Sequence, residues 1–228
     1  MSIDKNNVSA QAQTKKKNRI EIIDNGGKYN VLFLGNSITR HSPKSEIGWE
    51  NDWGMAASAK EKDYVHITVK LLEERLGKIN YGIINCSSWE SNYYKDEILD
   101  DFAEVNAFQA DIIVFRLGEN LWSAKEYFSS HPLASYYAKM VAYFAFNPAA
   151  KCIITTLFWK SEMIDKAIEE AARKKGCPLV HLGDLGDNKE NTANGKFWHA
   201  GVDMHPGDLG MQRIAERIAS AILQEFDT

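Results

Sequence analysis

The chain has 228 residues, of which 44% are hydrophobic and 25% are charged. This composition is typical of a soluble globular protein with a sizeable core, and the length fits one large domain or two small ones. The formal net charge of -4 at pH 7 lacks the basic footprint that nucleic-acid binding requires. We therefore expect no nucleic-acid partner.

The N-terminal segment 1–18 is polar and contains a run of three lysines at 15–17. It has no apolar stretch of the kind found in secretory signals, and no apolar run in the chain approaches membrane-spanning length. We expect a disordered leader over 1–28, a single domain over 29–228, no membrane partner and a cytoplasmic location.

The three cysteines, Cys86, Cys152 and Cys177, include no C-x-x-C pair. An odd number without metal-ligand spacing predicts neither a disulfide framework nor a zinc site. Each cysteine is interpreted as a small buried apolar residue. We expect no metal and no cofactor.

Short apolar runs mark the predicted strands in chain order. They lie at 31–34, 81–84, 112–115, 152–155 and 179–182. None of them alternates polar with apolar residues, which indicates parallel strands covered on both faces.

Amphipathic segments separate these runs. The segment 64–76 places Val65, Val69 and Leu72 on one stripe and ends before Gly77, which is typical of a helix. Further helices are expected over 161–175 and from about 208 to about 226. Alternation of strand and helix predicts a parallel α/β sheet with right-handed connections.

Ligands of such sheets bind beyond the carboxyl ends of the strands. At these ends the chain carries Gly35-Asn36-Ser37 after the first run and Gly118-Glu119-Asn120 after the third. Asp203-Met204-His205-Pro206 precedes the last helix. A serine at a strand-to-helix turn can point its hydroxyl into the cleft, since glycine allows the backbone to turn tightly.

These three blocks, in this order, resemble those of SGNH (GDSL-like) hydrolases. Gly-Asn-Ser is similar to the Gly-Asp-Ser of the first block, Gly118-x-Asn120 to the third and His205-Pro206 to the last. The resemblance spans the chain from about residue 30 onward. It implies a three-layer α/β/α sandwich, flavodoxin-like, with a central, mostly parallel five-stranded sheet, and a serine esterase working through an acyl-serine intermediate.

The resemblance also implies a role for each matching residue. Ser37 would attack the acyl carbonyl, and His205 would take the serine proton and later activate water. The Asn120 amide and the Ser37 backbone N–H would bind the oxyanion. A third backbone donor falls at Glu90, where the family usually has glycine.

The orienting acid departs from the family pattern. Three residues before the histidine stands Val202, whereas Asp203 stands two before, where an extended backbone would turn both side chains to one face. Asp203 is the candidate acid. Asp184, Asp187 and a Ser-His dyad steadied by a backbone carbonyl are the alternatives.

Arg116 is a second departure, because it ends an otherwise apolar strand. A buried charge requires a partner, and Glu90 and Glu119 lie at neighbouring strand ends. An ion pair with one of them is expected.

Aromatic side chains gather on the segments that follow the strands. Trp49, Trp53 and Trp159 are the candidates for substrate binding, since a ring face can stack on a sugar while polar neighbours bind its hydroxyls. Packing within the loops is the alternative for each ring.

These observations predict hydrolysis of short acyl esters, O-acetyl above all, on a small-molecule or saccharide substrate. The alternatives are a thioesterase or lysophospholipase of the same fold, and a carbohydrate-binding module that has lost catalysis. The oligomeric state is not predicted.

Overall fold

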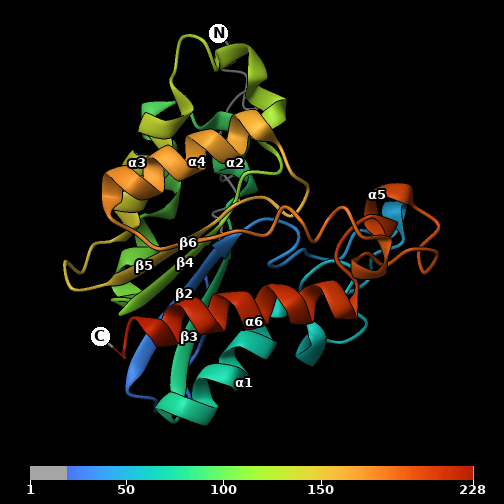
Figure 1. The fold of residues 1–228 in the computed structure, drawn as a ribbon, viewed down its shortest axis with the longest axis horizontal. Helices are drawn as coiled ribbons and strands as arrows, with labels where there is room; N and C mark the ends of the chain where they lie inside the picture. The colour runs from blue at the N-terminus through green and yellow to red at the C-terminus, as the bar shows by residue number, and fades with distance from the viewer. Residues whose placement is uncertain (1–19, 228) are drawn as a thin grey trace, which may run out of the picture.

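A central six-stranded sheet organises the computed structural model, which describes residues 20–227 (Figure 1). The strand order is β1-β3-β2-β4-β5-β6. The strands are β1 (Glu21–Ile23), β2 (Tyr29–Gly35), β3 (Ile79–Asn85), β4 (Ile112–Arg116), β5 (Lys151–Thr155) and β6 (Leu179–Val180). All neighbours pair in parallel except β1 and β3, which pair antiparallel.

The middle strands are buried on both faces, as their unbroken apolar runs predict. Val31 and Phe33 of β2 pack on one side of the sheet, and Leu32 and Leu34 pack on the other. The register sets Gly35 beside Asn85 of β3 and Arg116 of β4. Three strand ends therefore meet at one level, and the segments that follow them start close together.

Strand β1 is a sixth strand beyond the five predicted, and it lies within the predicted leader over 1–28. Residues 21–23 instead form the edge strand on β3, with Ile22 opposite Gly82. Three residues are too few to show a hydrophobic period, so the pattern gave no signal. The rest of the predicted leader, 1–19, lies outside the described residues.

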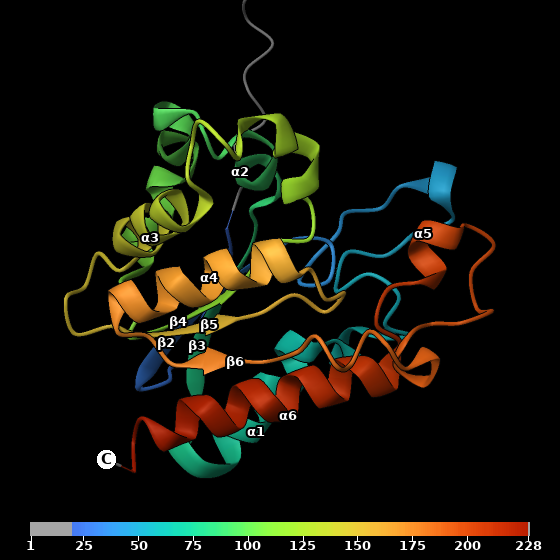
Figure 2. The ribbon, with the colours of Figure 1, turned by 45° about the horizontal axis from the view of Figure 1, so that its top comes forward.

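Helices cover both faces of the sheet and complete the predicted three layers (Figures 1 and 2). On one face α1 (Tyr64–Leu76) packs against α6 (Asp208–Gln224). On the other lie α2 (Ser87–Asn92), α3 (Leu133–Phe144) and α4 (Glu162–Lys175). The predicted α/β/α fold is confirmed.

The bounds of α1 follow from its ends. The Asp63 side chain accepts a hydrogen bond from the His66 N–H at 2.9 Å, and Gly77 ends the helix at a φ of 75°. An aspartate that caps the first turn and a glycine after the last turn are common at the two ends of helices. The predicted range of 64–76 is confirmed to the residue.

The connections are helical in part. They contain the 3-10 helices η2 (Ser45–Ile47), η3 (Lys60–Lys62), η4 (Asp96–Phe108), η5 (Leu121–Tyr127) and η6 (Lys189–Asn191), and the short helix α5 (Ala200–Asp203).

Two connections form a lobe beside the carboxyl edge of the sheet. In both ribbon views the segment after β2 and the segment before α6 lie together there, away from the helical layers. A small apolar core joins them, made of Trp49, Met55, Ala56, Ala193 and Val202. The lobe holds the last predicted site residue, His205, near the end of β2.

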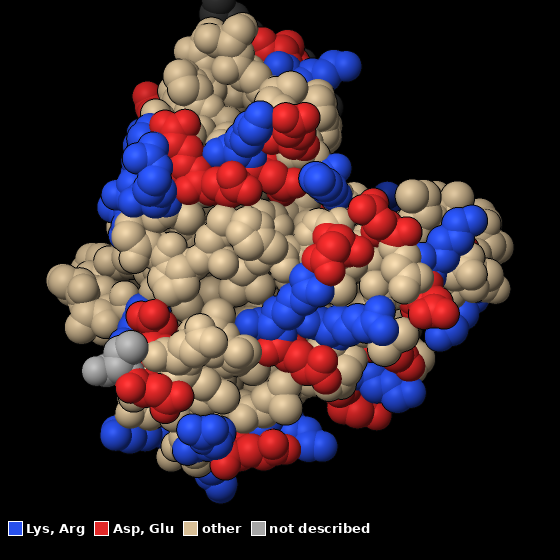
Figure 3. All heavy atoms as spheres, viewed as in Figure 1, with Lys and Arg blue, Asp and Glu red and all other residues tan. Residues whose placement is uncertain are grey.

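The face shown in Figure 3 carries acidic and basic side chains interspersed. On α4, Lys166 pairs with Glu162 and Lys174 pairs with Glu170, each one helical turn apart. Within residues 20–227, no helix has the length and apolar character needed to cross a bilayer.

Candidate active site

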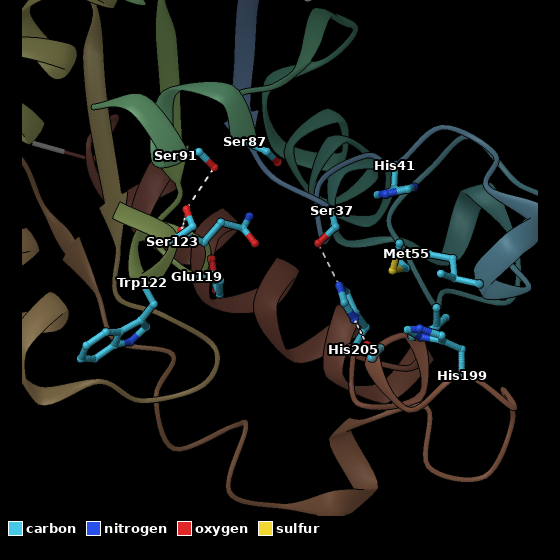
Figure 4. A pocket seen from close by; sticks show the side chains of 14 residues that line it. Ser37, His41, Met55, Ser87, Ser91, Glu119, Trp122, Ser123, His199 and His205 are labelled. Carbon is cyan, nitrogen blue, oxygen red and sulfur yellow. Dashed lines mark hydrogen bonds between the residues drawn. The ribbon is translucent and has the colours of Figure 1, made fainter. Parts of the chain in front are cut away.

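An open cavity of about 550 Å³ lies between the strand ends and the lobe. Ser37 and His205 stand at its centre (Figure 4). One wall carries His41, Met55 and His199 from the lobe. The opposite wall comes from α2 and η5 and carries Ser87, Ser91, Trp122 and Ser123.

The turn after β2 places the serine. The Asn36 carbonyl accepts from the Thr39 and Arg40 amides at 3.0 Å each, and the Asn36 side-chain oxygen accepts from the Ile38 N–H at 3.2 Å. The Ser37 N–H has no hydrogen-bond partner in the part of the chain that the structure describes. This amide is free to bind an anion in the cavity.

His205 reaches Ser37 from the far end of the chain. Its Nε2 lies 2.8 Å from Ser37 Oγ, and its Nδ1 lies 2.6 Å from the carbonyl oxygen of Gly201. Because a carbonyl only accepts, Nδ1 carries the proton and the Nε2 lone pair faces the serine hydroxyl. The ring is therefore held in the tautomer that can take the Ser37 proton.

Burial governs the charge of His205. It lowers the pKa of the ring to about 4, although the Gly201 carbonyl acts in the opposite direction. The neutral ring is therefore the resting form at neutral pH. A neutral imidazole is what a general base requires.

Asp203 does not hold the position predicted for it. Its carboxylate accepts hydrogen bonds from the amides of Gly195, Lys196 and Phe197 at 2.8–3.1 Å, and the Gly195 and Phe197 bonds lower its pKa. Residues 200–203 form α5, so the extended backbone on which the prediction depended is absent there. The Asp203 carboxylate turns toward the 195–197 loop instead. The carbonyl oxygen of Gly201 is the group in contact with Nδ1 of His205.

The alternative acids also lie elsewhere. Asp184 pairs with Arg217 through both carboxylate oxygens, at 2.5 and 2.7 Å. Asp184 and Asp187 line a different cavity beside α4. The geometry of the described residues is that of the remaining alternative, a Ser-His dyad with a backbone carbonyl.

Asn120 lines the cavity beside Ser37, but Glu90 does not supply the expected backbone donor. The Glu90 N–H lies 3.3 Å from the Cys86 carbonyl and is used within the turn that starts α2. The Glu90 side chain is fully buried and accepts from Asn120 Nδ2 at 2.6 Å. The helix α2, which starts just after β3, explains why this donor is unavailable. Within a helix the backbone N–H points along the helix axis toward an earlier carbonyl, so the Glu90 N–H does not point into the cavity.

Arg116 has the predicted partner. Its guanidinium forms an ion pair with Glu119, and one nitrogen donates to Asn36 Oδ1 at 2.9 Å. Asn36 Nδ2 donates to both Glu119, at 2.6 Å, and Glu90, at 3.1 Å. Burial and the neighbouring Glu119 raise the pKa of Glu90.

None of the three predicted stacking rings lines the cavity. Trp49 is fully buried and donates to the His41 carbonyl, while Trp53 donates to the Ala57 carbonyl from a half-buried position. Trp159 packs edge-on against His205, with ring centres 5.2 Å apart. Trp49 and Trp53 therefore contact loop backbone rather than the cavity, and Trp159 packs against the ring of His205.

The ring that does line the cavity, Trp122, was missed. It is 46% exposed and follows Asn120 by two residues, so its position after the third block was the available signal. Ser91 and Ser123 lie beside it and share a hydrogen bond of 3.1 Å (Figure 4). Ser87 occupies the same wall. An aromatic face with hydroxyls beside it suits an amphipathic alcohol.

Solved structures with the same fold include esterases. A family 3 carbohydrate esterase of Clostridium thermocellum superposes with a TM-score of 0.58 at 14% identity, covering 86% of this chain and 96% of that one. A protein of Bacteroides uniformis described as a GDSL-like lipase gives 0.56 at 17% identity, with coverages of 87% and 97%.

An acetyl xylan esterase of Butyrivibrio proteoclasticus gives a TM-score of 0.56 at 14% identity, and the alignment covers 88% of this chain and 65% of that one. No family model and no curated protein matches the sequence. At these identities the likeness establishes the fold, and the predicted fold is the one found.

The first prediction concerns Gly35. A Cβ at this position would lie 1.6 Å from Thr39 Oγ1, which itself bonds to the Tyr64 hydroxyl at 2.8 Å. Gly35→Ala must therefore displace the turn that carries Ser37. We expect a phosphonate probe to label Ser37 about a hundredfold more slowly, as a displacement near 1 Å can cause.

Gly176→Ala is the matched control for this prediction. Its Cβ would meet no atom within 4 Å, but its φ of 65° strains any side chain. It should lower the thermal unfolding temperature while leaving the labelling rate unchanged. Normal labelling of Gly35→Ala would show that the turn tolerates the methyl group.

The second prediction concerns the charge of His205. An NMR titration should show one ring, identified by its loss in His205→Gln, with a midpoint near pH 4. Because burial is the main cause, the low midpoint should persist in Ser37→Ala. A midpoint near 6.5, the ordinary value of histidine, would show that the surroundings of His205 do not keep the ring neutral.

Proposed function

We propose that the protein is a serine esterase in which Ser37 is the nucleophile and His205 its base. The single observation that carries the proposal is the 2.8 Å contact between Ser37 Oγ and His205 Nε2 at the centre of an open cavity. The fold, shared with carbohydrate esterases and GDSL-like lipases, supports it.

Acylation begins when Ser37 Oγ attacks the ester carbonyl carbon and its proton passes to His205 Nε2. The carbonyl oxygen becomes an oxyanion, which the free Ser37 N–H and the Asn120 side-chain amide bind. The intermediate collapses when the bond to the alcohol oxygen breaks. His205 returns its proton to that oxygen, and the alcohol leaves.

Deacylation repeats the sequence with water. His205 takes a proton from a water molecule as its oxygen attacks the acyl-serine carbonyl. The bond from the acyl carbon to Ser37 Oγ then breaks, Ser37 regains a proton from His205, and the carboxylic acid is released. Ser37, His205 and water account for every proton transferred and for every bond formed or broken in the two steps.

The Gly201 carbonyl would take the place of the orienting carboxylate. It fixes the tautomer of His205 through the 2.6 Å contact at Nδ1, and it stabilises the imidazolium only as a dipole. Asp203 would act on His205 only indirectly. Its three hydrogen bonds hold the 195–197 loop against α5, which contains Gly201.

The proposed substrate is a short acyl ester, with acetyl preferred, on a carbohydrate. The wall formed by Trp122, Ser91 and Ser123 supplies a ring face and hydroxyls for a sugar. The fold is shared with an acetyl xylan esterase and a family 3 carbohydrate esterase, which supports this choice.

A thioesterase or lysophospholipase would need a long aliphatic channel. The lining of this cavity contains only Ile47, Met55 and Val202 as aliphatic or thioether side chains, so the carbohydrate ester is favoured.

The third prediction tests the nucleophile and base. Ser37→Ala and His205→Ala should each lower kcat for acetyl ester hydrolysis about 10⁴-fold or more, with unchanged thermal unfolding. The double variant should be no slower than either single one, because the two residues act as a unit. Hydrolysis at the wild-type rate by either folded variant would refute the assignment.

The fourth prediction tests the sugar-binding wall. Trp122→Ala should lower the preference for acetylated sugars over p-nitrophenyl acetate about three- to tenfold, since one lost stacking contact costs about 0.5–1.5 kcal/mol. The measurement is kcat/KM on both substrates.

Trp198→Ala provides the matched control, since Trp198 is 74% exposed and does not line the cavity. It should leave both rates unchanged. An equal effect of Trp122→Ala on both substrates would remove Trp122 from sugar recognition. Faster cleavage of octanoyl than acetyl esters would favour a lipase-like enzyme.

A further inference from the structure

A buried carboxylate ties together the three segments that carry the proposed site. Glu90 is fully buried on α2, and its Oε1 accepts from Asn36 Nδ2 at 3.1 Å, Gly118 N at 2.6 Å and Asn120 N at 3.4 Å. Its Oε2 accepts from Asn120 Nδ2 at 2.6 Å. All four groups are donors, which suits an acceptor-only carboxylate.

The contact at Oε2 fixes which way the Asn120 amide faces. The Asn120 nitrogen, and not its oxygen, lies toward Oε2, which is the orientation that an ionised Glu90 carboxylate requires. Among the described residues Nδ2 has no other partner, which leaves its second N–H free. Asn120 lines the same cavity as Ser37.

We propose that Glu90 is a positioning residue for the ester reaction: its carboxylate orients the Asn120 amide so that the free N–H faces the oxyanion. The inference rests on the proposed function, since an oxyanion forms only if the protein cleaves an acyl bond. Glu90 touches no substrate and acts through Asn120.

Glu90→Gln tests this proposal directly, because the three donors at Oε1 determine how a glutamine side chain would be oriented. Three donors point at Oε1, so the glutamine oxygen must occupy that place and its nitrogen must take the place of Oε2. Two nitrogens would then face each other at the 2.6 Å contact, and the Asn120 amide would have to rotate. The volume of the side chain hardly changes.

We expect Glu90→Gln to lower kcat for acetyl esters about ten- to a hundredfold with little change in KM, because the oxyanion donor acts mainly in the transition state. In an Asn120→Ala background the same substitution should cause no further loss. A kcat within twofold of wild type, or an equal loss in both backgrounds, would overturn the proposal.

Asp165→Asn is the matched control. Asp165 is also a buried carboxylate, and it accepts from the amides of Leu157 and Ser161 at 3.0 and 2.9 Å, outside the candidate cavity. The substitution should lower stability without lowering kcat. A loss of kcat equal to that of Glu90→Gln would mean that any buried carboxylate supports the rate through stability alone.

An NMR measurement on the wild-type protein separates this proposal from the proposed function. The Asn120 side-chain amide, identified by its loss in Asn120→Ala, should show one proton shifted strongly downfield by the carboxylate. Two ordinary amide protons would overturn the orienting contact even in an active esterase. A shifted proton in a protein that cleaves no ester would leave the contact intact and refute the esterase.

Discussion

The arrangement at the strand ends depends on the buried guanidinium of Arg116. A charge in this position is tolerated only when it is paired and hydrogen-bonded. The ion pair with Glu119 and the bond to Asn36 pair its two terminal nitrogens, and Asn36 extends the network to Glu90. Because these residues follow three neighbouring strands, satisfying one charge fixes the spacing of β2, β3 and β4 at the edge where the cavity opens.

Residues that follow regular elements were predictable from the sequence. The apolar run at 31–34 located β2, and the turn after it placed Ser37 where the structure has it. The fold followed from the alternation of strands and helices, and Arg116 required a carboxylate because it ends a buried strand. In each case the physical constraint is local or follows from the sheet.

Residues in the long connections between strands and helices were not predictable in this way. Trp49 and Trp122 both follow strand ends, yet one is fully buried and the other is 46% exposed, and no period distinguishes them. Asp203 stands near His205 in sequence but turns to three loop amides, because α5 replaces the expected extended backbone. Such contacts depend on how long connections pack against one another, which sequence spacing does not encode.

The 168-residue separation of Ser37 and His205 has a consequence for the newly made chain. Synthesis proceeds from the N-terminus at about 5–20 residues per second, and a domain generally folds as a unit. The strands around Ser37 are synthesised long before His205, so the contact between Ser37 Oγ and His205 Nε2 cannot form until nearly the whole chain has been made. Under the proposed function, Ser37 therefore gains its base only after residue 205 has been made and the segment before α6 has packed beside the end of β2.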